Sequence, residues 1–74
     1  MISASGMRLI KLLVGSRPQT VAELIEATGV TRTAVTEQLN ELVAAGFVDR
    51  GTERLPGRGR PRYLYSATQS ARGL

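Results

Sequence analysis

The spacing between two helical patterns near the middle of the chain places the tightest limit on its fold. Thr20 and Glu23 form a capping box, in which a threonine and a glutamate three residues later satisfy backbone groups that the start of a helix leaves free. This helix ends at Gly29, because glycine adopts the left-handed conformation at little cost. Thr31 is a suitable N-cap for the next helix, only two residues later. The apolar line of that helix consists of Val35, Leu39 and Leu42. Two helices joined by so short a turn, with a glycine at its start, predict a helix-turn-helix.

Apolar residues at helical spacing also precede this pair of helices. Met7, Ile10, Leu13 and Val14 lie on one side of a first helix, which ends before Pro18 because proline lacks a backbone donor and disfavours helix in the residue before it. The sequence therefore predicts helices at about 5–15, 20–29 and 31–45.

The pattern changes after Gly46, which we expect to end the third helix. A strand pattern, a loop rich in glycine and arginine, and a returning strand follow, so a two-stranded β-hairpin is predicted at about 47–67. In the returning strand Tyr63 and Tyr65 share one face, and alternation alone leaves open which face is buried. Residues 69–74 show no periodicity and are expected to fray. We expect an α+β fold of three helices and a hairpin wing, with residues 1–74 as a single domain.

The chain has no cysteine and no histidine, which removes whole classes of function. A disulfide framework, an iron–sulfur cluster held by cysteines, a zinc finger and any catalytic group built on a thiolate or an imidazole are excluded within it. The capping box accounts for Glu23, and the other helical glutamates suit an exposed surface. We expect neither an enzyme nor a bound cofactor or metal. No segment has the pattern of a signal peptide or a membrane span, so we expect a cytoplasmic protein without a membrane partner.

The positive charge is concentrated in the last third of the chain. The formal net charge is +4, and the whole excess lies in residues 47–74, where every cation is an arginine. Guanidinium groups suit phosphates and base edges, because they offer a planar fork of donors and keep their charge. A basic segment without any partner is the alternative.

Three segments carry a resemblance to a known class of proteins. Residues 20–35 and 39–48 resemble the bacterial winged helix-turn-helix repressors, and the wing segment 57–62 is similar to that of two groups within them. One is a MarR/ArsR-like group that includes iron–sulfur-assembly repressors; the other is the N-terminal domain of repressors with a sugar-kinase-like domain. The resemblance covers about residues 7–68. It implies the N-terminal, DNA-binding part of a longer regulator that acts as a homodimer.

The predicted third helix presents candidate DNA-reading residues on its outer side and at its start. Thr33, Thr36, Glu37 and Asn40 are on the outer side, Arg32 is near the start, and Thr31 is the N-cap. In such folds the N-terminal half of this helix enters the major groove. Arg32 suits guanine N7 and O6, Glu37 suits cytosine N4, and Asn40 and the threonines suit bases or phosphates. Arg32 is opposed by Glu37 and Glu41, so we expect most of the affinity to come from the wing. A solvated helix face is the alternative.

The wing contains a dense run of arginines. Its candidate DNA contacts are Arg54, Arg58, Gly59, Arg60 and Arg62. The segment Arg58-Gly59-Arg60-Pro61 matches the core of an AT-hook, in which glycine lets an extended backbone enter the minor groove and arginines follow its negative floor. A wing that only clamps phosphates is the alternative.

These features together predict a sequence-specific reader of double-stranded DNA in a bacterial transcription regulator, acting as a repressor that occludes a promoter. The competing hypotheses are a winged helix used as a protein-interaction module and a non-specific nucleic-acid-binding protein with an architectural or RNA-binding role. Tyr63 and Tyr65 also permit a stacking platform for single strands, although packing within a hairpin is the commoner use of such tyrosines.

Overall fold

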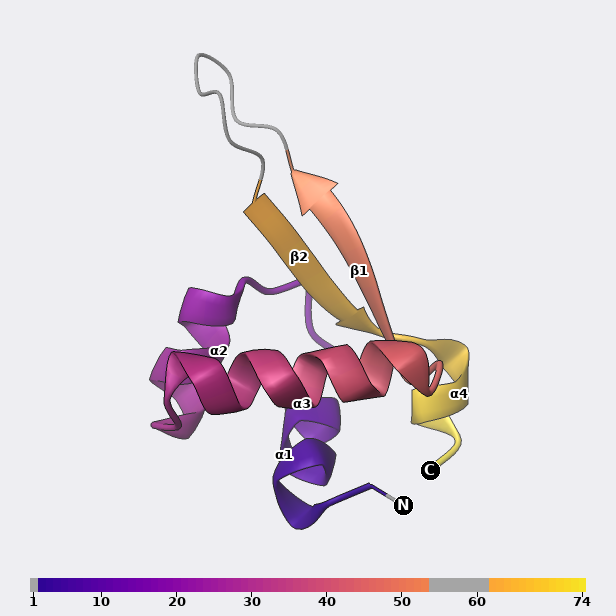
Figure 1. The fold of residues 1–74 in the computed structure, drawn as a ribbon. Helices are drawn as coiled ribbons and strands as arrows, with labels where there is room; N and C mark the ends of the chain where they lie inside the picture. Colours follow the sequence, from indigo (N-terminus) through magenta and orange to yellow (C-terminus); the bar gives the residue numbers. More distant parts are fainter. Residues whose placement is uncertain (1, 54–61) are drawn as a thin grey trace.

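The computed structural model describes residues 2–53 and 62–74. Its helices and strands are α1 (Ala4–Leu13), α2 (Val21–Thr28), α3 (Arg32–Ala44), β1 (Val48–Glu53), β2 (Arg62–Ala67) and α4 (Gln69–Arg72). The first three helices form the body of the molecule, and the two strands rise from it as a hairpin that projects well beyond the helices (Figure 1). With their capping residues, the helices agree with the predicted segments, and the α+β arrangement of three helices and a wing is confirmed.

Local capping chemistry sets the ends of α2 and the start of α3 as predicted. The backbone N–H of Glu23 donates to Thr20 Oγ1 at 3.1 Å, and the N–H of Thr20 donates to Glu23 Oε1 at 2.9 Å. Gly29 has φ 72°, the left-handed conformation that ends α2. Thr31 then caps α3, its Oγ1 accepting from the N–H of Ala34 at 3.3 Å. The turn between the two helices is therefore as short as the spacing of these residues requires.

A Schellman motif ends α3 and directs the chain into the hairpin. Gly46 has φ 85°, its N–H donates to the carbonyl of Val43 at 3.1 Å, and the N–H of Phe47 donates to the carbonyl of Leu42 at 2.9 Å. These two bonds satisfy carbonyls that the end of α3 would otherwise leave free.

The hairpin is antiparallel, with Val48 opposite Ala67 and Glu53 opposite Arg62. On the other edge of β2, Gln19 and Tyr65 exchange two backbone hydrogen bonds of 2.9 and 2.8 Å. This pairing fastens the wing to the loop before α2. At the base of the hairpin Val48 and Tyr65 are buried, which answers the question of which face of β2 meets the core.

The prediction that residues 69–74 fray is wrong for its first part. Thr68 Oγ1 caps the short helix α4 by accepting from the N–H of Ala71 at 3.4 Å, and Ala71 is buried. The hydroxyl of Thr68 also donates to the carbonyl of Gly46 at 2.7 Å. A helix of four residues is too short to show a period in the sequence, so its order comes from this cap and from the burial of Ala71.

The core lies where α1, α2, α3 and the base of the hairpin meet. Its buried members are Leu9, Ile10, Leu13, Leu24, Val35, Leu39, Leu42, Val48, Tyr65 and Ala71. The three predicted apolar residues of α3 are among them, so one side of α3 faces the core and the opposite side is left for contact with a partner. Among the described residues, no helix has the length and hydropathy needed to cross a membrane.

Candidate nucleic-acid interface

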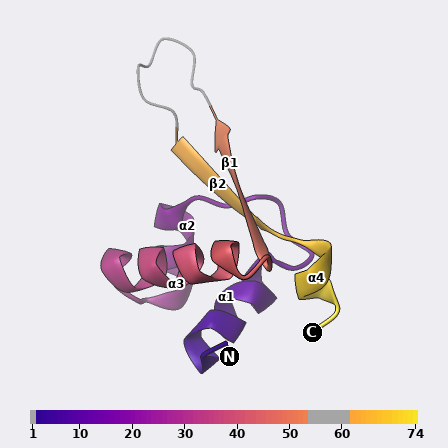
Figure 2. The ribbon, with the colours of Figure 1, turned by 45° about the vertical axis from the view of Figure 1, so that its right-hand side comes forward.

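The outer face of α3 carries the polar side chains that the sequence assigns to DNA reading. Arg32, Thr33, Glu37 and Asn40 are exposed, and Thr36 is half-buried. Thr33, Glu37 and Asn40 lie on the side of α3 away from the buried apolar line, whereas Arg32, three residues before Val35, lies in the first turn beside that line. Figure 2 shows α3 lying across the body, with the hairpin rising above it. The helix is therefore free along this face to approach a partner.

Thr31 differs from the other candidates because it already has a structural role. Its hydroxyl oxygen accepts the hydrogen bond that caps α3, which stabilises a helix by about 1 kcal/mol. Its side chain is exposed, at the same end of α3 as Arg32.

The structure brings Arg32 and Arg62 to the same hollow. This hollow, of about 310 Å³, is lined by Thr20, Val21, Ala22, Arg32, Arg62 and Tyr63, and we call it the arginine groove. Its walls come from the start of α2, the start of α3 and the start of β2. Two residues 30 positions apart in the sequence, one at the start of the helix and one in the wing, thus face a common space.

Arg62 is held by an ion pair across the hairpin. Its Nε lies 2.6 Å from Glu53 Oε1, and the two residues are directly opposite each other in the strand register. Both side chains are about half exposed, at 53% and 41%, so the pair adds little to stability. Its effect is on direction, because one edge of the guanidinium is fixed.

A second cross-strand contact in the wing joins Arg50 and Tyr63 and has no signal in the sequence. The Cζ atom of Arg50 lies 4.8 Å from the centre of the Tyr63 ring, which is the geometry of a cation–π interaction. Tyr63 is 50% exposed, whereas Tyr65 is buried. Burial in the core therefore accounts for Tyr65, whereas the exposed Tyr63 contacts Arg50 across the hairpin. The alternation of side chains along each strand can be read from the sequence, but the partner of each side chain depends on the strand register.

Glu23 and Arg17 form an ion pair beside the arginine groove. The backbone hydrogen bond from Thr20, followed by the one from Arg17, holds the pKa of Glu23 below its ordinary value. The hydrogen bond to Glu23 in turn raises the pKa of Arg17. The carboxylate at the start of α2 is thus already engaged on both sides.

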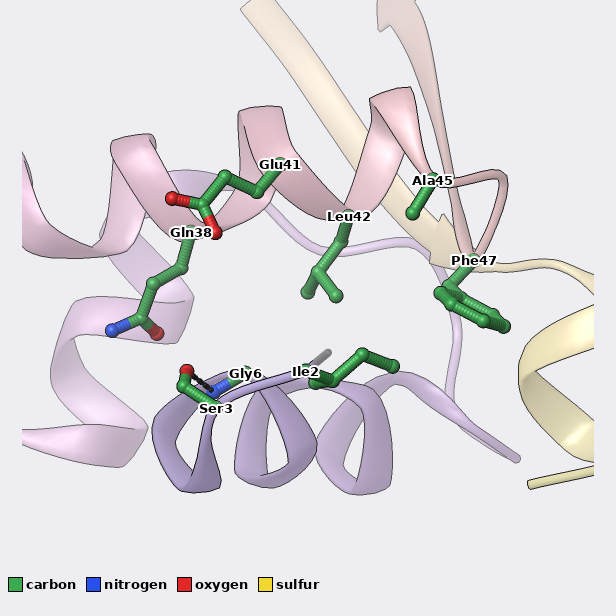
Figure 3. A pocket seen from close by; sticks show the side chains of 8 residues that line it. All are labelled: Ile2, Ser3, Gly6, Gln38, Glu41, Leu42, Ala45 and Phe47. Atoms are coloured by element: carbon green, nitrogen blue, oxygen red, sulfur yellow. Dashed lines mark hydrogen bonds between the residues drawn. The ribbon is translucent and has the colours of Figure 1, made fainter.

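Glu41 is exposed one turn after Glu37 on α3 and borders a second hollow. This hollow, of about 540 Å³, opens between α3 and the start of α1 (Figure 3). Its other lining residues are Ile2, Ser3, Gly6, Gln38, Leu42, Ala45 and Phe47. The two acids expected to oppose Arg32, Glu37 and Glu41, are thus both exposed on α3.

Four of the predicted wing contacts cannot be placed against this geometry. Arg54, Arg58, Gly59 and Arg60 lie outside the described residues, so Arg62 is the one predicted wing contact within them. The described residues contain no group of three or more acidic side chains arranged to hold a metal ion.

The fold and this surface define the class of protein. Three helices, with a glycine turn between the second and third, followed by an antiparallel hairpin beside the third helix, form a winged helix-turn-helix domain. Solved structures support this assignment. RV1404 from Mycobacterium tuberculosis matches with a TM-score of 0.81 and 26% identity, over 97% of this chain and 47% of that one.

Two further structures match equally well. A mutant of MarR from E. coli complexed with operator DNA has a TM-score of 0.79 and 25% identity, over 97% of this chain and 49% of that one. The transcriptional regulator Tm0710 from Thermotoga maritima has a TM-score of 0.83 and 22% identity, with the same coverages, and supports the fold alone. This chain therefore spans about half the length of these proteins. Among curated proteins, none shows significant sequence similarity to it.

The chain belongs to the MarR family, whose sequence profile matches residues 7–60. Of the two groups that the sequence resembles, the MarR-like one is thus confirmed. Family and fold together identify a winged-helix DNA-binding domain of the MarR type.

Proposed function

We propose that this domain reads double-stranded DNA in a sequence-specific way, with α3 in the major groove and the wing in the adjacent minor groove. The observation that carries the proposal is the arginine groove, in which Arg32 of α3 and Arg62 of the wing face the same hollow. The match to a MarR protein complexed with operator DNA supports it. A duplex lying along the exposed face of α3 meets both residues.

Base reading in this proposal belongs to α3, from its first residue Arg32 to Asn40. Arg32 pairs with guanine, Asn40 with adenine, and Glu37 accepts from cytosine, since these are the pairings that major-groove edges favour. Thr33 and Thr36 contact bases or phosphates. All five side chains are at least partly exposed.

For the wing arginines, the proposal rests on the sequence. We assign Arg54, Arg58 and Arg60 to the minor groove, with Gly59 allowing close backbone approach as in an AT-hook. A narrow A·T-rich groove concentrates negative potential, which favours arginine there.

For the whole regulator we propose repression by occlusion of a promoter, in a homodimer that recognises two half-sites. This chain then supplies one reader, in the N-terminal part of a longer polypeptide. Pairing of two copies suits operators with two-fold symmetry.

Arg32→Ala tests the reading role. The variant should lose about 1–3 kcal/mol of discrimination between a duplex selected for tight binding from a random pool and a scrambled duplex. Arg8→Ala is the matched control, because Arg8 is also exposed but lies on α1. An unchanged ratio of the two affinities in Arg32→Ala would remove it from the reading residues.

Replacing both Arg58 and Arg60 by alanine tests the wing. The slope of log K against log salt should decrease in magnitude by about 1.8, at about 0.9 for each phosphate charge neutralised. The loss should be larger on duplexes with A·T flanks. Lysine at both positions distinguishes the modes, because a phosphate clamp tolerates lysine and insertion into the groove does not. Equal losses on both flanks, with full rescue by lysine, would contradict groove insertion.

The same titration separates this function from a protein-interaction module. A DNA reader shows a negative salt slope on a random duplex, whereas a module for protein partners shows no duplex binding.

A further inference from the structure

The two grooves of a duplex are separated by a sugar–phosphate strand. A domain with α3 in the major groove and its wing in the adjacent minor groove must straddle that strand. In this structure the surface between the start of α3 and the base of the wing is the arginine groove. The part of this hollow between α3 and the wing therefore faces the phosphates of that strand, and Arg32, on the α3 wall, is the lining residue next to the major groove.

The chemistry of the arginine groove suits an anion. Its lining includes two guanidinium groups and a phenol and no carboxylate. The two acids bonded to its lining residues are both ion-paired, Glu53 with Arg62 and Glu23 with Arg17. A phosphate in the hollow would therefore contact cationic donors, because the two neighbouring carboxylates are already ion-paired.

Arg62 is oriented for such a contact. Its Nε is held by Glu53 at 2.6 Å, while its two terminal nitrogens have no hydrogen-bond partner among the described residues. The guanidinium is planar and rigid, so fixing the Nε edge also fixes the direction of the remaining donors.

Tyr63 is oriented in a similar way by a different neighbour. Arg50 covers one face of its ring at 4.8 Å, and half of the residue remains exposed. None of the side-chain hydrogen bonds among the described residues involves the phenol oxygen of Tyr63. A phenol O–H donates readily to a phosphate oxygen.

We propose that the arginine groove binds a backbone phosphate of the strand between the two DNA grooves, with Arg62 and Tyr63 as its donors. Glu53 and Arg50 are positioning residues that orient these donors. Arg32 contributes its charge on the wall that leads to the major groove. This proposal rests on the proposed function and adds Tyr63 and Arg50 to the interface.

The experiment uses Tyr63→Phe, which removes one hydroxyl and keeps the ring beneath Arg50. Tyr65→Phe is its matched control, because it makes the same chemical change at a buried position outside the groove. The probe is a random-sequence duplex, with fluorescence anisotropy measured over a series of salt concentrations. Tyr63→Phe should weaken binding about tenfold, the effect expected of a hydrogen bond to a charged group. It should leave the salt slope unchanged, since no charge is lost.

Arg62→Ala should instead reduce the salt slope by about 0.9, the effect of one phosphate charge. Neither variant should alter the preference between selected and scrambled duplexes, which distinguishes both from Arg32→Ala. Circular dichroism establishes that each variant is folded.

The outcomes separate the two proposals. Absence of duplex binding by the parent overturns the proposed function and this inference together. If the parent binds but Tyr63→Phe matches Tyr65→Phe, or Arg62→Ala keeps the parent's slope, the phosphate site is wrong and the reading function stands.

Discussion

Leu39 links the stability of this domain to the position of its reading helix. It is fully buried, at 0% exposure, on the side of α3 opposite the exposed polar residues. Replacing a buried leucine by alanine costs about 2–5 kcal/mol, because the transfer energy is lost and a cavity remains. A domain of 74 residues has a total stability of about 4–11 kcal/mol. Leu39→Ala should therefore remove a large share of the folding free energy.

A loss of about 3 kcal/mol corresponds to a decrease in melting temperature of about 12–24 °C for a domain of this size. The assay is thermal unfolding followed by far-ultraviolet circular dichroism, with urea titration for the free energy. Leu12→Ala is the control, since Leu12 is 37% exposed on α1. We expect it to cost no more than about 1 kcal/mol. Equal decreases for the two variants would refute the assignment of α3's inner face to the core.

Three local features give further predictions. Thr68→Val should cost about 1 kcal/mol in urea titration, because it removes the cap of α4 and the bond to the carbonyl of Gly46, and Thr68→Ser should restore most of it. Gly29→Ala should destabilise by about 1 kcal/mol, since Gly29 has φ 72° and nothing crowds its Cβ position, whereas Gly51→Ala in β1 should be neutral or slightly stabilising. For Glu23, whose pKa is lowered on folding, the stabilising contribution is present above the ordinary pKa of about 4.5 and is lost as pH falls through the folded value. Glu23→Gln should therefore remove part of the decrease in stability seen on acidification, and an identical pH profile would contradict this role.

Features governed by short-range chemistry could be predicted from the sequence. Thr20 with Glu23, Gly29 and Thr31 act within one turn of their own helices, and their caps have the predicted partners. The apolar line of α3 is likewise a local period. These residues determine the length of the turn and the exposed face of α3, so the polar side chains exposed on α3 could be predicted from the sequence.

Contacts between distant segments could not be predicted in the same way. The register that sets Glu53 opposite Arg62 and brings Arg50 over Tyr63 depends on how two strands pair across a long connection. The bridge between Gln19 and Tyr65 joins segments with no sequence signal for pairing. The partial burial of a side chain likewise depends on contacts between segments that are distant in the sequence, so it could not be predicted from local patterns.

Affinity and specificity should depend on different parts of this domain. On α3, Arg32 is opposed by the exposed carboxylate of Glu37, so the helix brings little net attraction to a polyanion. The net positive charge of the chain lies in residues 47–74, and Arg62 of the wing lines the arginine groove next to the start of α3. Phosphate contacts of this kind add binding energy on every sequence, whereas Glu37 disfavours the duplexes that give it no donor. A weakly attractive helix beside a strongly basic wing thus allows the domain to hold any duplex loosely and to discriminate through α3.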